Sequence, residues 1–475
     1  MPHAIAIPLA PYRHRWLVFA AMLAGEVMDV LDMGILHVAG PALEHELGAT
    51  PAQLQWAVGG YALAMGACLI VGGRLGDVYG RRRMFLTALA GFALTSLLCA
   101  LAPTMHLLIV ARLLQGVAGA LLLPQGFALL RAVFGPDELG KALAIFGPVM
   151  GLAAIAGPVV GGGIIAADYF GLGWRFALGV NTPVALAALL VAWRCVPRDP
   201  PQALAGEVDL SGAALIAISC GLLVAPLIQG QEAGWPLWAW ASLGLAGAGF
   251  TSFVRQQRRR VHSGRVPLVE PGLFAKPAFS AGILGMGLFF SAFIGMQLVF
   301  TLFLQLGQGY GAGEAGLAAL PLTGGCFIGS GLAGGFLLER IGARVLQLGA
   351  VLQIAAVAWL WRALDSTGFS LTALAPALVL LGVGGGMVIA SLITIIISAV
   401  DEREAGSGSG LLAAVQAISS AAGIALLSGL FFGRLAAGDP AGGYRLALAA
   451  QALLLILFLL VSFALPVRSR ATATA

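Results

Sequence analysis

Long apolar runs recur along the whole chain, and many of them reach the length that a helix needs to cross a lipid bilayer. Such a helix takes about 20 consecutive apolar residues. Hydrophobic residues make up 59% of the chain and charged residues only 10%, which departs strongly from the composition of soluble domains. Because the bilayer interior offers no water to the backbone, runs of this length must satisfy their hydrogen bonds internally. The sequence therefore predicts an all-α polytopic membrane protein.

The runs and the loops between them also predict a topology. Lys and Arg are enriched in the cytoplasmic loops of membrane proteins, and most of the 26 Lys and Arg residues fall in alternate loops, beginning with the N-terminal segment. We therefore expect a multi-pass protein of the cell membrane with both termini in the cytoplasm and an even number of spans. The expected spans lie near residues 15–38, 52–72, 84–102, 106–130, 142–166, 175–196, 209–229, 236–254, 277–306, 314–336, 344–363, 370–399, 408–432 and 444–466.

A short internal repeat indicates how these spans are grouped. Five residues of one loop recur in a later loop with the same spacing: Gly73, Leu75, Asp77, Gly80 and Arg82 correspond to Gly335, Leu337, Glu339, Gly342 and Arg344. Parallel repeats of this kind relate the two halves of some transporters. We expect an N-terminal six-helix bundle in residues 1–200, two inserted transmembrane helices with linkers in 201–272, and a C-terminal six-helix bundle in 273–475.

Three carboxylates lie inside the first apolar run, at Glu26, Asp29 and Asp32. Steps of three residues keep them on one side of a helix. An ionised group at this depth is costly, so acids in spans usually face a cavity and belong to ion or proton pathways. These acids are therefore candidate proton carriers. His37 lies close to the same face and is open to two interpretations, a proton relay or a hydrogen-bonded histidine at the membrane interface.

The repeated loop combines glycines with charged residues in a pattern that predicts a movable latch. Glycine permits a sharp connection between helices, an acid can bind helix N-terminal amides, and arginines can exchange ion-pair partners. We expect Asp77 to be the acid that binds the start of the next helix. The latch residues are Gly73, Asp77, Gly80, Arg81 and Arg82 in the first copy, with Glu339 and Arg340 in the second.

The fifth span is rich in glycine and proline, at Gly151, Gly157, Pro158, Gly161 and Gly162. Small residues allow helices to approach closely, and proline removes a backbone donor and can bend a helix. These residues are candidates for a hinge or a tight helix interface.

Several of these segments resemble known signatures. The loop from Gly73 to Arg83 resembles the cytoplasmic signature of the major facilitator superfamily, which stabilises one access state, although Val78 stands where that pattern commonly has a basic residue. The fifth-span residues look like the antiporter signature of proton-driven exporters in that superfamily. Three more segments resemble patterns of the fourteen-span drug:H+ antiporter family: Leu31-Asp32 with Val38-Ala39 and Pro41, Arg112 with Gln115, Gly116 and Gly119, and Trp174-Arg175 with Asn181 and Pro183.

This resemblance implies the major facilitator fold, with two six-helix bundles and two extra helices between them. It also implies that Asp32 exchanges protons for substrate and that Arg112 takes part in the proton relay. Asp29 and Glu26 are further candidates by position alone. Arg112 has a second interpretation, a structural partner for an acid or for backbone carbonyls.

The function that follows is a proton-coupled antiporter that exports amphipathic or cationic drug-like compounds. Export of one metabolite, such as an antibiotic, siderophore or amino acid, is an alternative, and a non-transporting membrane receptor is a weaker one. We expect a substrate cavity between the halves near the midplane, with Gln297, Phe293 and Gln416 as candidates. The expected partners are a small-molecule substrate, protons and lipids, with the monomer as functional unit. No enzymatic activity, catalytic residue, cofactor, metal site or nucleic-acid partner is expected.

Overall fold

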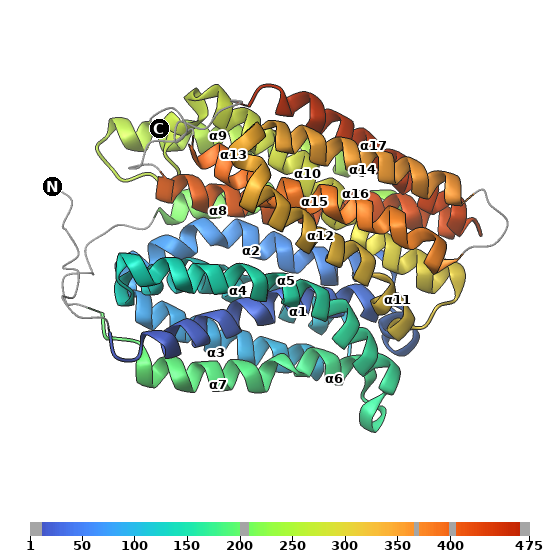
Figure 1. The fold of residues 1–475 in the computed structure, drawn as a ribbon, viewed down its shortest axis with the longest axis horizontal. Helices are drawn as coiled ribbons and strands as arrows, with labels where there is room; N and C mark the ends of the chain where they lie inside the picture. The colour runs from blue at the N-terminus through green and yellow to red at the C-terminus, as the bar shows by residue number, and fades with distance from the viewer. Residues whose placement is uncertain (1–11, 200–208, 365–369, 399–404, 466–475) are drawn as a thin grey trace.

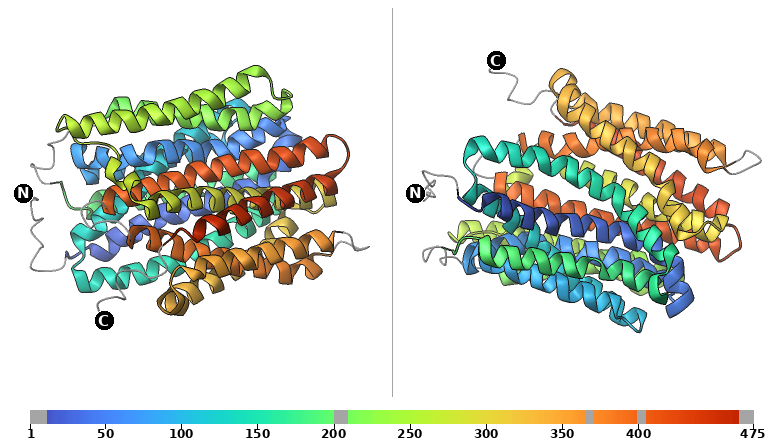
Figure 2. Two further views of the ribbon diagram at one scale, coloured as in Figure 1. Left: turned by 90° about the horizontal axis from the view of Figure 1, so that it is seen from above. Right: turned by 60° about the horizontal axis from the view of Figure 1, so that its bottom comes forward.

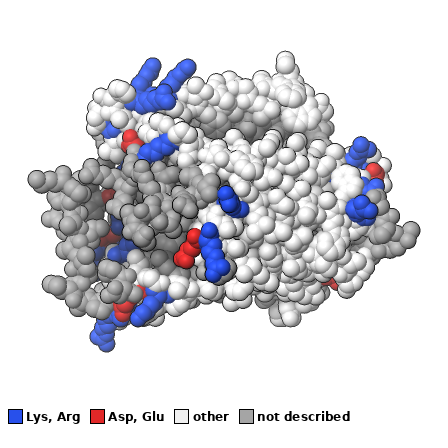
Figure 3. Space-filling model, turned by 45° about the horizontal axis from the view of Figure 1, so that its top comes forward, with Lys and Arg blue, Asp and Glu red and all other residues white. Residues whose placement is uncertain are grey.

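The computed structural model describes residues 12–199, 209–364, 370–398 and 405–465, and the secondary structure in these ranges is helical. The helices run roughly along one common direction and form an elongated bundle (Figure 1). Figure 3 shows one face of the molecule on which charged side chains lie at the right end and scattered over the left half, with an uncharged band between them. A helical bundle with such a band is suited to a bilayer.

The helices of the first half and of the insertion agree closely with the apolar runs. They are α1 (Arg15–Leu47), α2 (Pro51–Tyr79), α3 (Arg81–Ala100), α4 (Met105–Val133), α5 (Pro136–Ala167), the 3₁₀ turn η1 (Tyr169–Gly171), α6 (Gly173–Gly179), α7 (Asn181–Cys195), α8 (Leu210–Glu232) and α9 (Leu237–His262).

The second half has the same alternation of long helices and short connections. Its elements are η3 (Pro271–Ala275), α10 (Pro277–Leu302), the π-helical segment η4 (Phe303–Gly307), α11 (Ala312–Ala318), α12 (Leu320–Leu332), the π-helical segment η5 (Ala333–Leu337), α13 (Leu338–Ile341), α14 (Arg344–Ala363), α15 (Leu371–Ser398), α16 (Ala405–Leu435) and α17 (Pro440–Ser462).

Within the described residues, 13 helices are long and apolar enough to cross a membrane. Helix α1 is not among them, although it has 33 residues and is as long as the spanning helices beside it. The reason is that Glu26, Asp29 and Asp32 give its apolar stretch more charged residues than the other spans have. With α1 included, the described residues contain fourteen helices long enough to cross a membrane, which is consistent with the number of spans expected from the sequence.

The helices before and after the insertion occupy different parts of the bundle. In Figure 1 the blue to green helices α1 to α7 lie below, and the yellow to red helices of the second half lie mostly above, except α11, which reaches down beside the first half. The inserted pair α8 and α9 lies along one side of the bundle (Figure 2, left). Cys220, Val224 and Ile228 of α8 pack with α2 and α16, so this hairpin covers the line where the two halves meet.

We call the end of the bundle that carries Arg74, Arg81 and Arg82 the basic end, and the other the opposite end. Near the opposite end the halves pack tightly, because a Cβ added to Gly162 of α5 would overlap the carbonyl oxygen of Ala312, and one added to Gly316 would overlap that of Pro158. Closer to the middle, a Cβ added to Gly151 would lie 3.0 Å from the Phe327 ring of α12.

Toward the basic end α5 and α12 part. Gly147 and Gly140 lie on the same face of α5 as Gly151, and a Cβ added to either would meet no atom of the described residues within 4 Å. The same is true of Gly331, one turn after Phe327 on α12. Along this pair of helices, the structure is closed at the opposite end and open toward the basic end.

Candidate functional site

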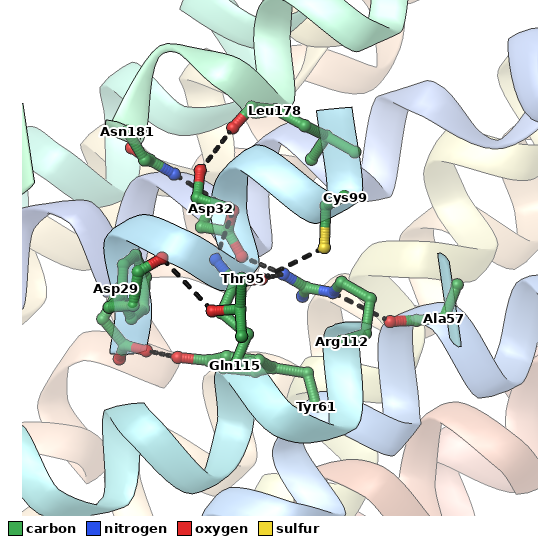
Figure 4. A network of polar contacts seen from close by, with 12 residues as sticks. Asp29, Asp32, Ala57, Tyr61, Thr95, Cys99, Arg112, Gln115, Leu178 and Asn181 are labelled. Atoms are coloured by element: carbon green, nitrogen blue, oxygen red, sulfur yellow. Dashed lines mark hydrogen bonds and ion pairs between the residues drawn. The ribbon is translucent and has the colours of Figure 1, made fainter. Parts of the chain in front are cut away.

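The centre of the first half holds a buried ion pair between α1 and α4. Asp32 and Arg112 are both 0% exposed, and Arg112 Nη1 donates a hydrogen bond to Asp32 Oδ2 (Figure 4). A carboxylate without this partner would be strongly unfavourable in such a place, and so would the arginine. The structure therefore places together the two residues that the sequence predicted to be involved in proton coupling.

Two further side chains, one from α7 and one from α4, supply donors to the same carboxylate. Asn181, the first residue of α7, donates its Nδ2 to Asp32 Oδ1 at 3.0 Å, and Gln115 Nε2 lies 3.4 Å from the same oxygen. Gln115 Oε1 in turn accepts from Arg112 Nη1 at 2.8 Å. These residues are buried, so water does not compete with these bonds and their geometry is fixed by the protein.

Arg112 is held in place from α2 as well. Its Nε donates to the carbonyl oxygen of Ala57 at 3.1 Å, and its Cζ lies 4.4 Å from the centroid of the Tyr61 ring. Its Nη2 has no partner among the described residues. The guanidinium thus binds an acid and a backbone carbonyl together, as the structural interpretation expects, and the proton relay stays a prediction.

A second acid lies beside this pair. The Tyr61 hydroxyl donates to Asp29 Oδ1, and the Tyr61 ring lies against Arg112, so one side chain contacts both the acid and the arginine. Figure 4 shows Asp29 and Asp32 on successive turns of α1, with Tyr61 below them. Through Tyr61, Asp29 is connected to the Asp32 site although the two carboxylates have different partners.

Glu26 and His37 extend the polar face of α1 in both directions. Glu26 is 7% exposed and has no hydrogen-bond partner among the described residues, and it lies nearer the basic end than Asp29. His37 is 5% exposed, and its Nε2 is unpartnered within the same set. This burial argues against an interfacial histidine. Four titratable groups thus follow one another along the helix.

A cluster at the opposite end positions α7. Glu46 near the end of α1 accepts a hydrogen bond from Trp174 Nε1 at 2.6 Å and pairs with Arg175 at 2.8 Å, and the Arg175 guanidinium lies over the Trp174 ring. Trp174 and Arg175 belong to α6, which leads directly into Asn181. This cluster fixes α6 against α1 and so holds Asn181 beside Asp32.

The latch region differs from the sequence expectation in one respect. Helix α2 continues to Tyr79, so Gly73, Gly76 and Asp77 lie in its last turns, and Gly80 alone connects it to α3 with a φ of 96°. Asp77 accepts from the side chain of Arg81, the first residue of α3, at 3.2 Å and makes no hydrogen bond to a backbone N–H of α3. The prediction for Asp77 was wrong. The apolar run ends near residue 72, but α2 continues to Tyr79, so Asp77 lies within α2 and not in a connecting loop.

Asp199, after α7, performs the role expected of Asp77. Its Oδ1 accepts from the backbone N–H of Arg82 at 3.0 Å and its Oδ2 lies 3.4 Å from that of Arg83. Arg82 also donates its Nη2 to the carbonyl oxygen of Trp193 at 2.6 Å. In the second copy, Glu339 and Arg340 lie on the exposed surface of α13.

The glycines of α5 form a tight interface with two helices. Gly157 and Gly161 lie against Gly34 and Ile35 of α1, where an added Cβ would approach to 3.1 and 2.8 Å. Gly162 and Pro158 face α11, as described above. The α5 residues therefore bring both α1, which carries the acids, and the second half into contact with one helix.

The substrate-cavity candidates are separated in the structure. Phe293 and Gln297 of α10 line a small cavity with Gln451 and Tyr444 of α17, whereas Gln416 lies on α16 outside this lining. This small cavity lies within the second half, between α10, α12, α14, α15 and α17. The substrate cavity expected between the two halves stays a prediction.

Some site residues had little sequence signal. Tyr61, Ala57 and Asp199 were not predicted, and Asn181 and Gln115 entered only as members of family-like patterns. A buried tyrosine hydroxyl needs a partner, but the sequence does not show which acid lies opposite it. Among the described residues, no group of three or more His, Cys, Asp and Glu side chains is arranged to hold a metal ion.

The sequence and structure can now be compared with known proteins. Residues 22–207 and 210–424 match the family model of the Major Facilitator Superfamily. The chain belongs to the Major Facilitator Superfamily. It is accordingly a multi-pass membrane transporter and not an enzyme.

Curated relatives within this superfamily cover nearly the whole chain. A probable actinorhodin transporter of Streptomyces coelicolor is 36% identical over 91% of this chain and 75% of its own length. A puromycin resistance protein of Streptomyces alboniger is 35% identical over 92% and 87%, and a tetracenomycin C resistance and export protein of Streptomyces glaucescens is 33% identical over 88% and 76%.

Solved structures show the same fold at low identity. A bacterial homologue of the human lysosomal transporter Spinster, in an inward-facing and occupied conformation, has a TM-score of 0.64 at 16% identity, covering 96% of this chain and 97% of its own. An auto-inhibited peptide transporter of the POT family has a TM-score of 0.67, also at 16% identity, covering 95% and 98%.

Proposed function

We propose that this transporter is a proton-coupled antiporter that exports amphipathic or cationic drug-like compounds by alternating access. The observation that carries the proposal is the buried Asp32–Arg112 pair, held by Gln115 and Asn181 within the first half. The names of the three Streptomyces relatives, which refer to transport, resistance or export, support the outward direction.

The mechanism is a competition for the carboxylates of α1. Binding of a proton to Asp32 removes its attraction to Arg112, whereas an ionised Asp32 restores the pair. A buried pair is sensitive to the loss of either charge, so protonation changes the packing between α1 and α4. We assign the proton-carrying role to Asp32 and Arg112 first, with Asp29 next through Tyr61 and Glu26 nearest the basic end.

The open side of the structure fits this scheme. We propose that the basic end faces the cytoplasm, because cytoplasmic loops are rich in Arg and Lys, and that both termini lie on that side of the membrane. The divergence of α5 and α12 is then toward the cytoplasm, as in an inward-facing state that receives cargo. We further propose that the unit is one chain in the cell membrane, divided at residues 1–200, 201–272 and 273–475.

A second candidate is dedicated export of one antibiotic-like metabolite. The relatives favour it, because each of them is named for a single compound. Both candidates use the same acids, and they differ in the range of compounds carried.

The experiment uses inside-out membrane vesicles with an imposed pH gradient. Uptake of ethidium, a cationic dye, and of puromycin is measured together with substrate-induced proton release for the original chain, Asp32→Asn, Asp29→Asn and Glu26→Gln. We expect Asp32→Asn to abolish gradient-driven uptake and the other two to weaken it. Equal activity in all four chains would refute the coupling site. Uptake of one compound only would favour the dedicated exporter.

A further inference from the structure

The inserted hairpin ends in a buried polar cluster at the basic end. Asp209, just before α8, is 3% exposed and accepts hydrogen bonds from Ser211 Oγ and Gly212 N, both at 2.9 Å. From α9, Gln257 Nε2 donates to its Oδ2 at 2.9 Å and Arg260 Nη1 pairs with its Oδ1 at 3.2 Å. These contacts fasten the start of α8 to the end of α9.

Gln257 has a second set of contacts outside the hairpin. Its Oε1 accepts from the backbone N–H of Leu268 at 2.7 Å and lies 3.4 Å from that of Val269. Gln257 is 2% exposed, and Leu268 and Val269 are buried in the largest hydrophobic core of the molecule. One amide side chain therefore holds the segment 267–269 against the hairpin.

The held segment contacts the latch. The carbonyl oxygen of Pro267 accepts a hydrogen bond from Arg74 Nη2 at 3.1 Å, and Arg74 follows Gly73 in the first copy of the repeat. A proline carbonyl is an acceptor whose own residue has no N–H to pair, and its direction is set by the neighbouring residues. Here those neighbours are Leu268 and Val269, whose amides Gln257 binds.

We infer that Gln257 is a positioning residue that connects the inserted hairpin to the latch through the Pro267 carbonyl and Arg74. The contact exists in a state that is open toward the basic end, and a bond made in one state raises the population of that state. The hairpin thereby biases the access equilibrium of the transporter. This inference rests on the proposed alternating access and gives the two inserted helices a role in it.

The chain offers a matched control on the adjacent residue. Gln256 also donates to Asp209, at 3.4 Å, and to Ser211 Oγ at 2.8 Å, but it has no contact with the segment 267–269. Gln256→Leu thus weakens the hairpin alone, whereas Gln257→Leu releases the segment as well. Arg74→Leu removes the hydrogen bond to the Pro267 carbonyl from the α2 side. Because Arg74 is only half buried, this variant should fold even if Gln257→Leu does not, and it keeps the test decisive.

The test measures the access equilibrium directly. Spin labels are attached through Gly147→Cys on α5 and Gly331→Cys on α12, in a chain whose five native cysteines are replaced, and the distance distribution is recorded in lipid nanodiscs. We expect Gln257→Leu and Arg74→Leu each to reduce the ratio of open to closed populations about 3- to 10-fold, the size expected of one hydrogen bond. Gln256→Leu should leave the ratio within about twofold.

The double variant Gln257→Leu with Arg74→Leu decides between a shared contact and two independent effects. A shared contact gives no further shift beyond the larger single effect, because the second change removes a bond that is already lost. Full multiplication of the two shifts, or equal shifts for Gln256→Leu and Gln257→Leu, would overturn the inference. A single population in the original chain under all pH values and substrates would instead refute the proposed alternating access.

Discussion

Asp32 is bound by side chains from two helices other than its own, and the two oxygens of its carboxylate have different partners. Arg112 binds Oδ2, and Asn181 and Gln115 approach Oδ1. Hydrogen bonds to a charged group contribute about 1.5–3 kcal/mol each. Because the carboxylate is fully buried, no water replaces a donor that is lost.

Replacement of Asn181 tests this at a single donor. We expect Asn181→Leu to reduce pH-driven transport about tenfold or more, because Asp32 loses one of its buried donors. The matched control is Thr182→Val, since the Thr182 hydroxyl is buried without a partner among the described residues and an apolar group of the same shape can replace it at little cost. Initial rates in vesicles, normalised to folded protein, are the measurement. Equal losses in both variants would contradict this role of Asn181.

Sequence alone located the charged members of the site but few of their partners. An acid or an arginine within an apolar run is conspicuous, because its burial needs an explanation. Tyr61 and the Ala57 carbonyl have no such signal, since every span contains backbone carbonyls, an uncharged tyrosine is not conspicuous in an apolar run, and only the packing of α2 against α4 selects these two groups. Asp199 was overlooked for a related reason, as it lies far along the chain from the helix start that it binds.

At the scale of elements, α5 mediates between the acids and the second half. One side of it packs on α1 through Gly157 and Gly161, and another side packs on α11 through Gly162. Because backbones meet directly there, even a single methyl group has to displace a helix. The closed opposite end therefore depends on glycine at particular positions of α5.

A pair of adjacent glycines makes this testable. We expect Gly162→Ala to open the α5–α11 contact and at least halve the initial transport rate, because its Cβ would overlap the Ala312 carbonyl. Gly163→Ala meets no atom within 4 Å and should retain the original rate with unchanged or slightly higher stability, since alanine favours helix by about 1 kcal/mol. A rate for Gly162→Ala equal to that of Gly163→Ala would refute the proposed close packing.

The contacts of Asp209 that hold the start of α8 to the end of α9 contribute a stability that depends on pH. Burial raises the pKa of Asp209, but hydrogen bonds from Gln257, Gly212 and Ser211 and the charge of Arg260 outweigh burial and leave the pKa below its ordinary value. A lowered folded-state pKa gives stability that is complete above the unfolded-state pKa of about 4 and is lost as the pH falls through the folded-state value.

We therefore expect Asp209→Asn to lower the apparent melting temperature in detergent at pH 7, by an amount that corresponds to about 1 kcal/mol. The difference from the original chain should shrink as the pH falls below about 4, where the original carboxyl also becomes neutral. Glu44→Gln, a change at an exposed acid of α1, serves as control and should have little effect at either pH. A loss for Asp209→Asn that stays constant with pH would contradict this account.

The elements themselves were well predicted, and their ends were not. Apolar runs mark the part of a helix within lipid, and α1, α2 and α9 continue beyond it to Leu47, Tyr79 and His262. Backbone hydrogen bonding can extend a helix into water with polar residues, and hydropathy does not record this extension. This is why the latch was predicted as a loop and is mostly helix.

At the scale of the whole molecule, the structure is one access state of a transporter whose halves meet through α5 and α11 at one end. In a rocking motion, closure of the basic end accompanies opening of the opposite end. Sequence predicted two halves and an insertion from the repeat and the span count. It did not place the small cavity, because the lining residues come from five helices whose packing is a property of the folded bundle.

Thiol labelling tests which end is open. We expect Gly140→Cys, in the chain without native cysteines, to react rapidly with a membrane-impermeant maleimide in inside-out vesicles, because its surroundings are open. An outward-directed change of state should slow this reaction at least threefold. Gly163→Cys, near the opposite end of α5, should react from the other side of the membrane only. Equal reactivity of position 140 from both sides would contradict the assigned orientation.

The hydrogen bonds from Leu268 and Val269 to Gln257 also limit how far the two halves can move relative to each other. The hairpin and this anchored stretch contact α2 through Arg74, so residues 270–276, which include η3 and its buried Leu273, form the connection from this anchor to α10. Seven residues reach at most about 25 Å when fully drawn out. The length of this connection sets an upper bound on how far the two halves can move apart during transport. Inserting residues into it is the direct way to learn whether this bound is ever approached.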